Sequence, residues 1–182
     1  MGTKGKEIVG KDAKDLVELL NNALADEWLA YYQYWVGALV VKGPMRPEVQ
    51  GELKEHAEEE LKHAGLLAER IIQLGGSPIL DPKEFAAKSN CGYDAPKDGH
   101  VLKILGQNIK GEQCAIDVYN KLLQRLKTTS DMISFNMIRK ILEDYGVPLL
   151  PLLAREQFPK VEEKPGEVLY HRFDRDDPLP SY

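Results

Sequence analysis

Four side chains of this sequence have the types and spacing of metal ligands. Glu60 and His63 are three residues apart, so on one helix the carboxylate and the imidazole lie on the same face. The segment from residue 52 to 63 is rich in glutamate, so this spacing alone is weak evidence. Glu27 stands among apolar and aromatic neighbours, where a charged group is costly to bury unless it is paired or binds a metal ion. Either Glu27 binds metal, or it lies at the edge of its helix face and reaches solvent.

A repeat within the chain favours the metal-binding interpretation. Three residues recur at one offset of 85 positions: Glu27 as Glu112, Ala30 as Ala115, and Tyr34 as Tyr119. Each tyrosine follows its glutamate by seven residues, which is close to two helical turns. We therefore expect both tyrosines to reach the layer of the glutamates, where they hydrogen-bond to carboxylates and hold the ligands in place. The chain is interpreted as two related helical hairpins.

Long helices are needed to position these side chains. Apolar residues at helical spacing predict helices over residues 12–41, 47–74 and 99–127, and a fourth that begins near Ser130. Residues 77–97 connect the second helix to the third and carry a short helix near residues 81–88; a connection of this length is often functional. We expect an all-α four-helix bundle with one long crossover. Its limits would be an arm over 1–11, the bundle over 12–154 and a tail over 155–182.

The fourth helix lacks the ligand pair that the repeat predicts. A di-iron site in a bundle takes a glutamate from each of two helices and a Glu-x-x-His pair from each of the other two. The 85-residue offset places the second pair at Tyr145 and Pro148. Three explanations stay open: the site is incomplete, Glu143 or Asp144 substitutes in a deviating helix, or the sequence over 145–154 contains an error. With a simple helical register, Glu143 and Asp144 point elsewhere.

Composition and charge limit the other classes of function. The net charge of −5 argues against nucleic acid as the main partner, because phosphate binding favours a basic surface. No apolar run approaches the ~18 residues of a membrane-spanning helix, and the N-terminal stretch lacks the apolar core of a secretory signal. We expect a cytoplasmic protein that binds neither DNA nor membranes.

The two cysteines and one further histidine have more than one interpretation. Cys91 and Cys114 are either two reduced, buried small side chains or a disulfide between the crossover and the third helix that passes electrons. His56 lies one helical turn before Glu60. We interpret His56 as solvated or as a neighbour of the ligands, and not as a ligand.

Taken together, these residues resemble the ferritin-like superfamily of di-iron carboxylate proteins. The chain looks most like the Dps-like branch, some members of which are called thioferritins, over roughly residues 10–144. The Glu-x-x-His pair is unspecific, whereas the surroundings of Cys91 together with Glu-Gln-Cys-Ala are fairly specific. The matching segments are Glu27 in ALADEWLAYYQYW, Glu60 and His63 in AEEELKHAGLLAERIIQLGG, Cys91 in SNCGYDAP, and Glu112 with Cys114 in GEQCAIDVY.

The resemblance implies a cage of twelve subunits that stores iron and protects against oxidative stress. Each subunit would hold two iron ions at a ferroxidase site, oxidise Fe(II) with hydrogen peroxide or dioxygen, and deposit ferric mineral inside the cage. The resemblance makes Glu27, Glu60, His63 and Glu112 the catalytic metal ligands, and it makes Cys91 and Cys114 a redox pair close to the metals. The residues at positions 145 and 148 depart from the family pattern, which puts full occupancy by two ions in doubt.

Two alternatives remain beside this interpretation. The first is a rubrerythrin-like peroxidase, but such proteins usually add a module with paired Cys-x-x-Cys motifs, and this chain has none. The second is a non-catalytic helical bundle with a degenerate metal site, which the broken motif of the fourth helix favours. Metal content of the purified protein separates the second alternative from the enzyme.

Overall fold

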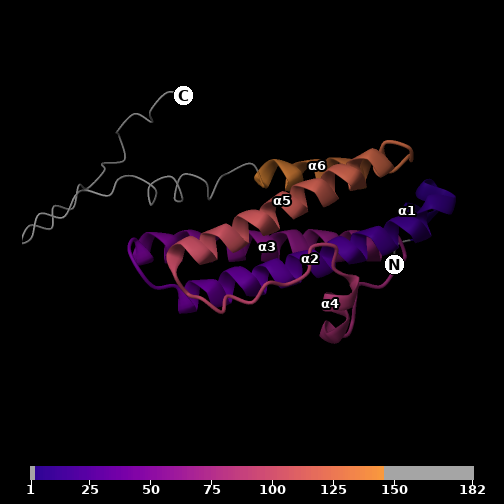
Figure 1. Ribbon diagram of the computed structural model, residues 1–182. Helices are drawn as coiled ribbons and strands as arrows, with labels where there is room; N and C mark the ends of the chain where they lie inside the picture. Colours follow the sequence, from indigo (N-terminus) through magenta and orange to yellow (C-terminus); the bar gives the residue numbers. More distant parts are fainter. Residues whose placement is uncertain (1–2, 146–182) are drawn as a thin grey trace, which may run out of the picture.

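The expected all-α architecture is confirmed. The computed structural model describes residues 3–145 (Figure 1). Within that range its regular elements are all helices. The tail predicted over 155–182 and the end of the predicted bundle lie outside the described residues. The elements are α1 (Thr3–Val9), the 3₁₀ turn η1 (Gly10–Asp12), α2 (Ala13–Val40), α3 (Arg46–Gln73), the 3₁₀ turn η2 (Pro82–Glu84), α4 (Phe85–Lys88), α5 (Val101–Leu126) and α6 (Met132–Asp144).

Two hairpins joined by a long crossover make the bundle. Helices α2 and α3 lie side by side along their length, and α6 lies along α5 on one side of that pair (Figure 1). The crossover returns along α2 and carries α4, where Phe85 stacks on Trp28 with ring centroids 6.0 Å apart. A residue in the left-handed region, Met45 at φ 54°, makes the turn before α3, and Pro47 occupies its first turn.

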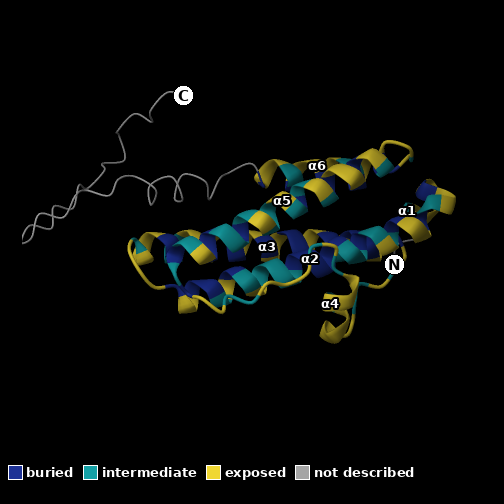
Figure 2. Ribbon diagram, in the orientation of Figure 1, coloured by how far each residue is buried: buried dark blue, intermediate teal, exposed yellow. Residues whose placement is uncertain are grey.

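The apolar core is divided into two clusters along the bundle. One cluster gathers around Leu20, Leu67 and Leu126, and the other gathers around Leu53 and Leu105. The buried stripe runs along the inward faces of the helices (Figure 2). On α2, α3 and α5 the stretch between the two clusters carries buried polar side chains instead. This polar layer contains the predicted ligands.

A buried ion pair fixes the start of α6. The side chain of Asp131 accepts a hydrogen bond from the backbone N–H of Ser134 at 3.0 Å and one from Arg70 Nη2 on α3 at 2.6 Å. The sequence predicted the start of this helix near Ser130. Asp131 is the capping residue, because its carboxylate accepts a hydrogen bond from a backbone N–H of the first turn. Because α6 is held at this end, its last turn reaches the polar layer.

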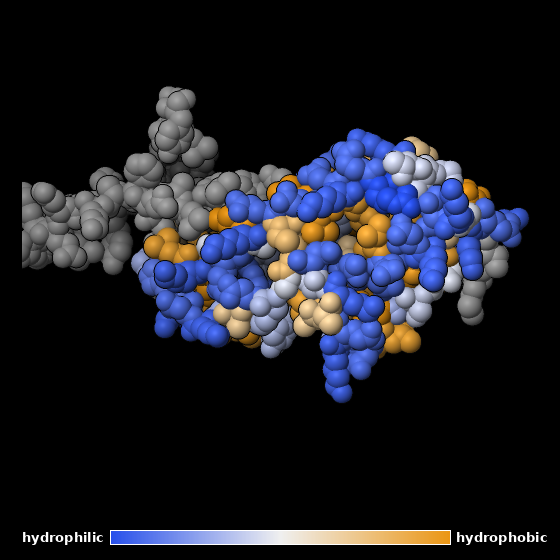
Figure 3. Space-filling view, turned by 45° about the vertical axis from the view of Figure 1, so that its right-hand side comes forward, coloured by the Kyte–Doolittle hydropathy of each residue, from blue (hydrophilic) through white to orange (hydrophobic). Residues whose placement is uncertain are grey.

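On the face of the molecule seen in Figure 3, hydrophilic side chains predominate, and apolar side chains are exposed in patches between them. None of the helices over residues 3–145 combines the length and the apolarity that crossing a membrane requires.

Candidate metal centre

Glu27 on α2 and Glu60 and His63 on α3 form one buried cluster. His63 Nδ1 lies 3.5 Å from Glu27 Oε2 and 3.3 Å from Glu60 Oε2. Glu27 is fully buried, and Glu60 and His63 are 3% and 5% exposed. Among the described residues, Glu27 Oε2 has no hydrogen-bond partner, although a buried carboxylate oxygen normally has one.

This cluster fits a metal ion. One ligand atom from each of the three side chains lies within 4.8 Å of the others. Two ligands that each lie ~2.0–2.2 Å from one ion are separated by roughly 3–4 Å, which matches the spacing around His63. Carboxylate oxygen and imidazole nitrogen suit iron and zinc, and an ion here would give the unpartnered oxygen of Glu27 its missing contact.

Glu112 on α5, the fourth predicted ligand, lies in the same polar layer but outside this three-residue group, and hydrogen bonds between the two hairpins connect the two. The hydroxyl of Tyr34 donates to Glu112 Oε1, and the hydroxyl of Tyr119 donates to Glu27 Oε1. The two tyrosines thus reach the layer that the seven-residue spacing predicted. Each tyrosine holds the glutamate of the opposite hairpin and not the one on its own helix.

The end of α6 also reaches the centre. The hydroxyl of Tyr145 lies 3.0 Å from Glu27 Oε1 and 2.9 Å from Glu60 Oε2. Tyr145 therefore stands where the repeat would place a carboxylate, and position 148 lies outside the described residues. Asp144 does not point away, as a simple helical register would have required: its Oδ2 lies 3.2 Å from His63 Nε2, because α6 ends directly over His63. Glu143 does point away and pairs with Arg139 at the surface.

Protonation lowers the electrostatic cost of burying these groups together. Burial, and then the charge of Glu27, raise the pKa of Glu60 well above its usual value. Burial also opposes ionisation of Glu27, but the close approach of Glu60 and of His63 outweighs burial and lowers the pKa of Glu27. Burial disfavours the charged form of His63 too, yet the two nearby carboxylates, Glu27 and Glu60, raise its pKa to about 10. At neutral pH the cluster therefore holds a proton on His63, and burial beside Glu27 favours the protonated form of Glu60.

His56 lies on the other side of the polar layer, against Glu112. It is 9% exposed and stacks on Tyr34 with ring centroids 5.1 Å apart. Its Nδ1 lies 3.9 Å from Glu112 Oε1 and 3.7 Å from Glu59 Oε2. Burial lowers the pKa of His56, and burial is the main cause that raises the pKa of Glu112 to about 7. Of the two interpretations offered for His56, the structure supports a buried neighbour of the ligands.

Asp26 is a buried group that the sequence analysis missed. Its carboxylate accepts hydrogen bonds from Ser89 Oγ at 2.5 Å, Asn90 Nδ2 at 2.7 Å and the backbone N–H of Cys91 at 2.9 Å. Burial raises the pKa of Asp26 even though these hydrogen bonds lower it. Asp26 thus holds the crossover against α2 beside Glu27. The signal was present, since Asp26 shares the apolar surroundings that singled out Glu27.

A disulfide ties the crossover to α5 next to the centre. Cys91 and Cys114 are joined with their Cα atoms 5.8 Å apart, so the structure has the joined form of the two that the sequence left open. Cys91 borders a cavity of about 250 Å³ that reaches inward to Glu60 and Tyr145. Tyr34 and Glu112 line the same cavity. It connects the crossover side of the molecule with the centre.

A bundle of long helices with buried carboxylates and a histidine in its middle layer is the architecture of di-iron carboxylate proteins. The model of the family described as "Ferritin-like domain" matches residues 17–146. The chain therefore belongs to the ferritin-like family.

Several proteins resemble this chain over most of its length. A solved structure of a bacterioferritin-related protein from Bacteroides fragilis, described as a dodecameric thioferritin, is 44% identical, with a TM-score of 0.75 over 84% of this chain and 95% of that one. A DNA protection during starvation protein of Pyrococcus furiosus is 31% identical over 64% of this chain, and the match spans 63% of that relative's length. Dps from Staphylococcus aureus, at 19% identity and a TM-score of 0.74 over 80% of this chain and 97% of that one, shares the fold.

Proposed function

We propose that this protein is a Dps-like ferroxidase and iron-storage protein. It binds Fe(II) at Glu27, Glu60 and His63, with Glu112 as a further ligand, and oxidises it with hydrogen peroxide. The observation that carries this proposal is the buried cluster whose carboxylate oxygen, Glu27 Oε2, has no partner among the described residues. The match to the ferritin-like family model and the similarity to a thioferritin support iron as the metal.

The side chains supply charge, protons and access for this reaction. Two Fe(II) ions each give up one electron, and hydrogen peroxide takes two electrons and two protons as its O–O bond breaks to form two waters. The carboxylates balance the rising charge on iron. Glu60 and His63 release their protons on binding Fe(II). Tyr119 and Tyr145 hold Glu27 in place, and the cavity of about 250 Å³ has room for peroxide to approach.

The chain is also proposed to assemble into a closed cage of twelve copies, which stores ferric mineral and limits oxidative stress. The similarity to a protein described as dodecameric supports the number. On α2 three large apolar side chains stay exposed on one helical face: Tyr32 at 48%, Trp35 at 44% and Leu39 at 55%. Exposed apolar surface of this kind marks protein–protein interfaces, and closed symmetry is usual for repeated copies of one chain.

The double variant Glu60→Ala with His63→Ala tests the proposal. We expect rapid peroxide-dependent Fe(II) oxidation, followed by stopped-flow absorbance of Fe(III), to be abolished, because the variant removes two of the three clustered ligands. Native mass spectrometry should show the same assembly as the wild type, because the exposed face of α2 is unchanged.

The matched control changes two exposed residues of the same helix, Glu58→Ala with Lys62→Ala, and should oxidise Fe(II) at the wild-type rate. Equal kinetics in the wild type and in the Glu60/His63 variant would contradict the proposed site. A wild-type protein that retains no iron after anaerobic loading would favour the non-catalytic bundle. A wild type that consumes peroxide with electrons from a reductase, while storing no iron, would favour the rubrerythrin-like alternative.

A further inference from the structure

The disulfide lies between a cavity and a groove. On one side, Cys91 borders the cavity of about 250 Å³ that reaches Glu60 and Tyr145, called here the inner cavity. On the other side, Cys114 borders a groove of about 660 Å³ between α2, α5 and the crossover, called here the outer groove. Cys114 is absent from the described lining of the inner cavity, and Cys91 is absent from that of the outer groove. Each cysteine is therefore reached from a different side.

The outer groove has the size and the charges of a site for a small zwitterion. Its volume of about 660 Å³ lies within the ~300–1,000 Å³ of small-molecule pockets. Lys121 and Asp117 of α5 line it as exposed charges, and neither forms an ion pair with another described residue. Arg125 also lines the groove but is paired with Asp12 and Asp15. Lys121 can thus bind a carboxylate, and Asp117 can bind an ammonium group.

Asp26 holds Cys91 in position independently of the disulfide. Its carboxylate accepts hydrogen bonds from the backbone N–H of Cys91 and from Ser89 Oγ. Ser89 Oγ in turn accepts a hydrogen bond from the backbone N–H of Gly92 at 2.8 Å. These contacts need no sulfur–sulfur bond. Cys91 therefore stays beside Cys114 when the disulfide is reduced, and the pair can form the bond again.

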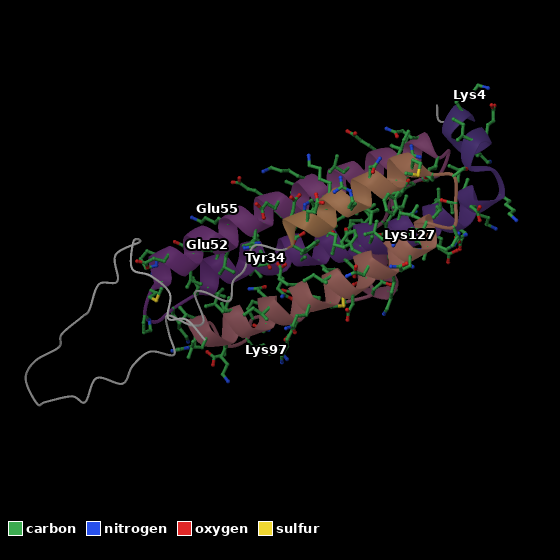
Figure 4. The ribbon with its side chains drawn as sticks, turned by 90° about the horizontal axis from the view of Figure 1, so that it is seen from above. Lys4, Tyr34, Glu52, Glu55, Lys97 and Lys127 are labelled. Carbon is green, nitrogen blue, oxygen red and sulfur yellow. A yellow bond between two sulfur atoms is a disulfide. The ribbon has the colours of Figure 1, made fainter. Side chains whose placement is uncertain are left out.

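The inner cavity gives hydrogen peroxide a path to Cys91. Tyr34 lies inside the bundle (Figure 4) and lines this cavity together with Glu112. The cavity thus extends from the crossover to the middle of the bundle. A peroxide molecule in it can reach Cys91 as well as the metal centre.

We propose that Cys91 and Cys114 reduce hydrogen peroxide with electrons from a small zwitterionic thiol, without iron. A thiolate in the outer groove attacks Cys114 Sγ, forms a mixed disulfide there and displaces Cys91 as a thiolate. The Cys91 thiolate then attacks one oxygen of hydrogen peroxide. The O–O bond breaks, hydroxide leaves and takes up a proton to give water, and Cys91 becomes a sulfenic acid.

Two further steps close the cycle. A second small thiol attacks the mixed disulfide and releases Cys114 as a thiol, with a small-molecule disulfide as the product. Cys114 attacks the sulfenic sulfur of Cys91, water leaves, and the protein disulfide forms again. One turn converts one peroxide and two small thiols into two waters and one small-molecule disulfide. This activity goes beyond the proposed function, since it uses neither the ligand cluster nor iron.

Brief treatment of the oxidised full-length protein with L-cysteine, followed by an acid quench, tests the direction of attack. Peptide mass mapping should find the added cysteine on Cys114 and a free thiol on Cys91. The reason is that Cys114 alone of the two borders the outer groove. L-cysteine bound to Cys91, or to both residues equally, would overturn the assigned direction.

The peroxide step is tested on the reduced full-length protein, freed of small thiols and kept with an iron chelator. One equivalent of hydrogen peroxide should consume both thiols of the wild type. Cys114→Ser should gain one oxygen atom at Cys91, which dimedone traps as a sulfenic acid, whereas Cys91→Ser should stay reduced. Dimedone present during oxidation of the wild type should label Cys91, which gives the same test without a variant.

Two lysine variants of α5 test the outer groove. Reduction of the disulfide by L-cysteine should slow about two- to fivefold in Lys121→Gln, the effect of losing one exposed ion pair. Reduction by the neutral β-mercaptoethanol should not change. Lys127→Gln is the matched control, since Lys127 is exposed and is not among the residues that line the groove. Equal rates with L-cysteine in both variants and the wild type would overturn the groove as the thiol site.

The chelator separates this inference from the proposed function. A reduced wild type whose two thiols survive peroxide would overturn the thiol-dependent activity and leave the proposed ferroxidase untouched. Oxidation of Cys114 in Cys91→Ser as fast as that of Cys91 in Cys114→Ser would also overturn it, because the inner cavity would then not select Cys91.

Discussion

Four groups in the centre, Glu27, Glu60, His63 and Tyr145, share a small number of protons. The pKa of Glu27 is lowered, which favours its ionised form, while the raised pKa values of Glu60 and His63 favour their protonated forms. The Tyr145 hydroxyl can donate to Glu27 Oε1 and accept from protonated Glu60. Both short contacts of this hydroxyl are then hydrogen bonds. The metal-free protein thereby avoids two buried negative charges side by side. A divalent ion can replace the protons and satisfy Glu27 Oε2.

Metal binding should therefore release protons. His63 holds a proton in the folded protein at pH 7 because its pKa is raised to about 10, and it must lose that proton to bind an ion. The raised pKa of Glu60 acts in the same direction. The affinity for Zn(II) should rise as pH increases from 6 to 8. Calorimetry in two buffers with different ionisation enthalpies should give different apparent binding enthalpies at pH 7. Identical enthalpies in both buffers would refute this protonation pattern.

The helices themselves could be predicted from the sequence, because the spacing of apolar residues is a local signal. Helices predicted over 47–74 and 99–127 are found at Arg46–Gln73 and Val101–Leu126. The contacts that orient these helices could not be predicted in the same way. The cap at Asp131 depends on Arg70, 61 residues away, and the anchoring of the crossover depends on Asp26. No local pattern specifies such partners, so the approach of Asp144 to His63 could not be predicted either.

The disulfide should stabilise the crossover against α5. It joins residues 23 positions apart, and closing a loop of that size in the unfolded chain stabilises the folded form by about 3 kcal/mol. Replacing Cys91 and Cys114 together by alanine should therefore lower the midpoint of guanidinium unfolding.

Reduction of the wild type should lower the unfolding midpoint in the same way. The control is the reductant added to the double alanine variant, which should have no further effect. A double variant as stable as the oxidised wild type would show that the disulfide does not restrain the crossover.

In the molecule as a whole, the two hairpins are related by an approximate sequence repeat, and together they build one polar layer. The 85-residue offset is visible in the sequence, and it correctly indicated that two glutamates and two tyrosines meet in one layer. It did not indicate that each tyrosine binds the glutamate of the other hairpin, because a repeat says nothing about which half contacts which. It also failed at position 145, where a tyrosine takes the place of a carboxylate. The two apolar clusters on either side hold this polar layer in place.

An anomalous difference map from crystals of the whole protein soaked with Fe(II) under anaerobic conditions tests the central claim most directly. We expect a peak between α2 and α3 at ~2.0–2.2 Å from side-chain atoms of Glu27, Glu60 and His63. The same map from Glu60→Ala with His63→Ala should lack this peak. Iron found only on surface carboxylates of the wild type, with none at these three side chains, would contradict the proposed metal centre.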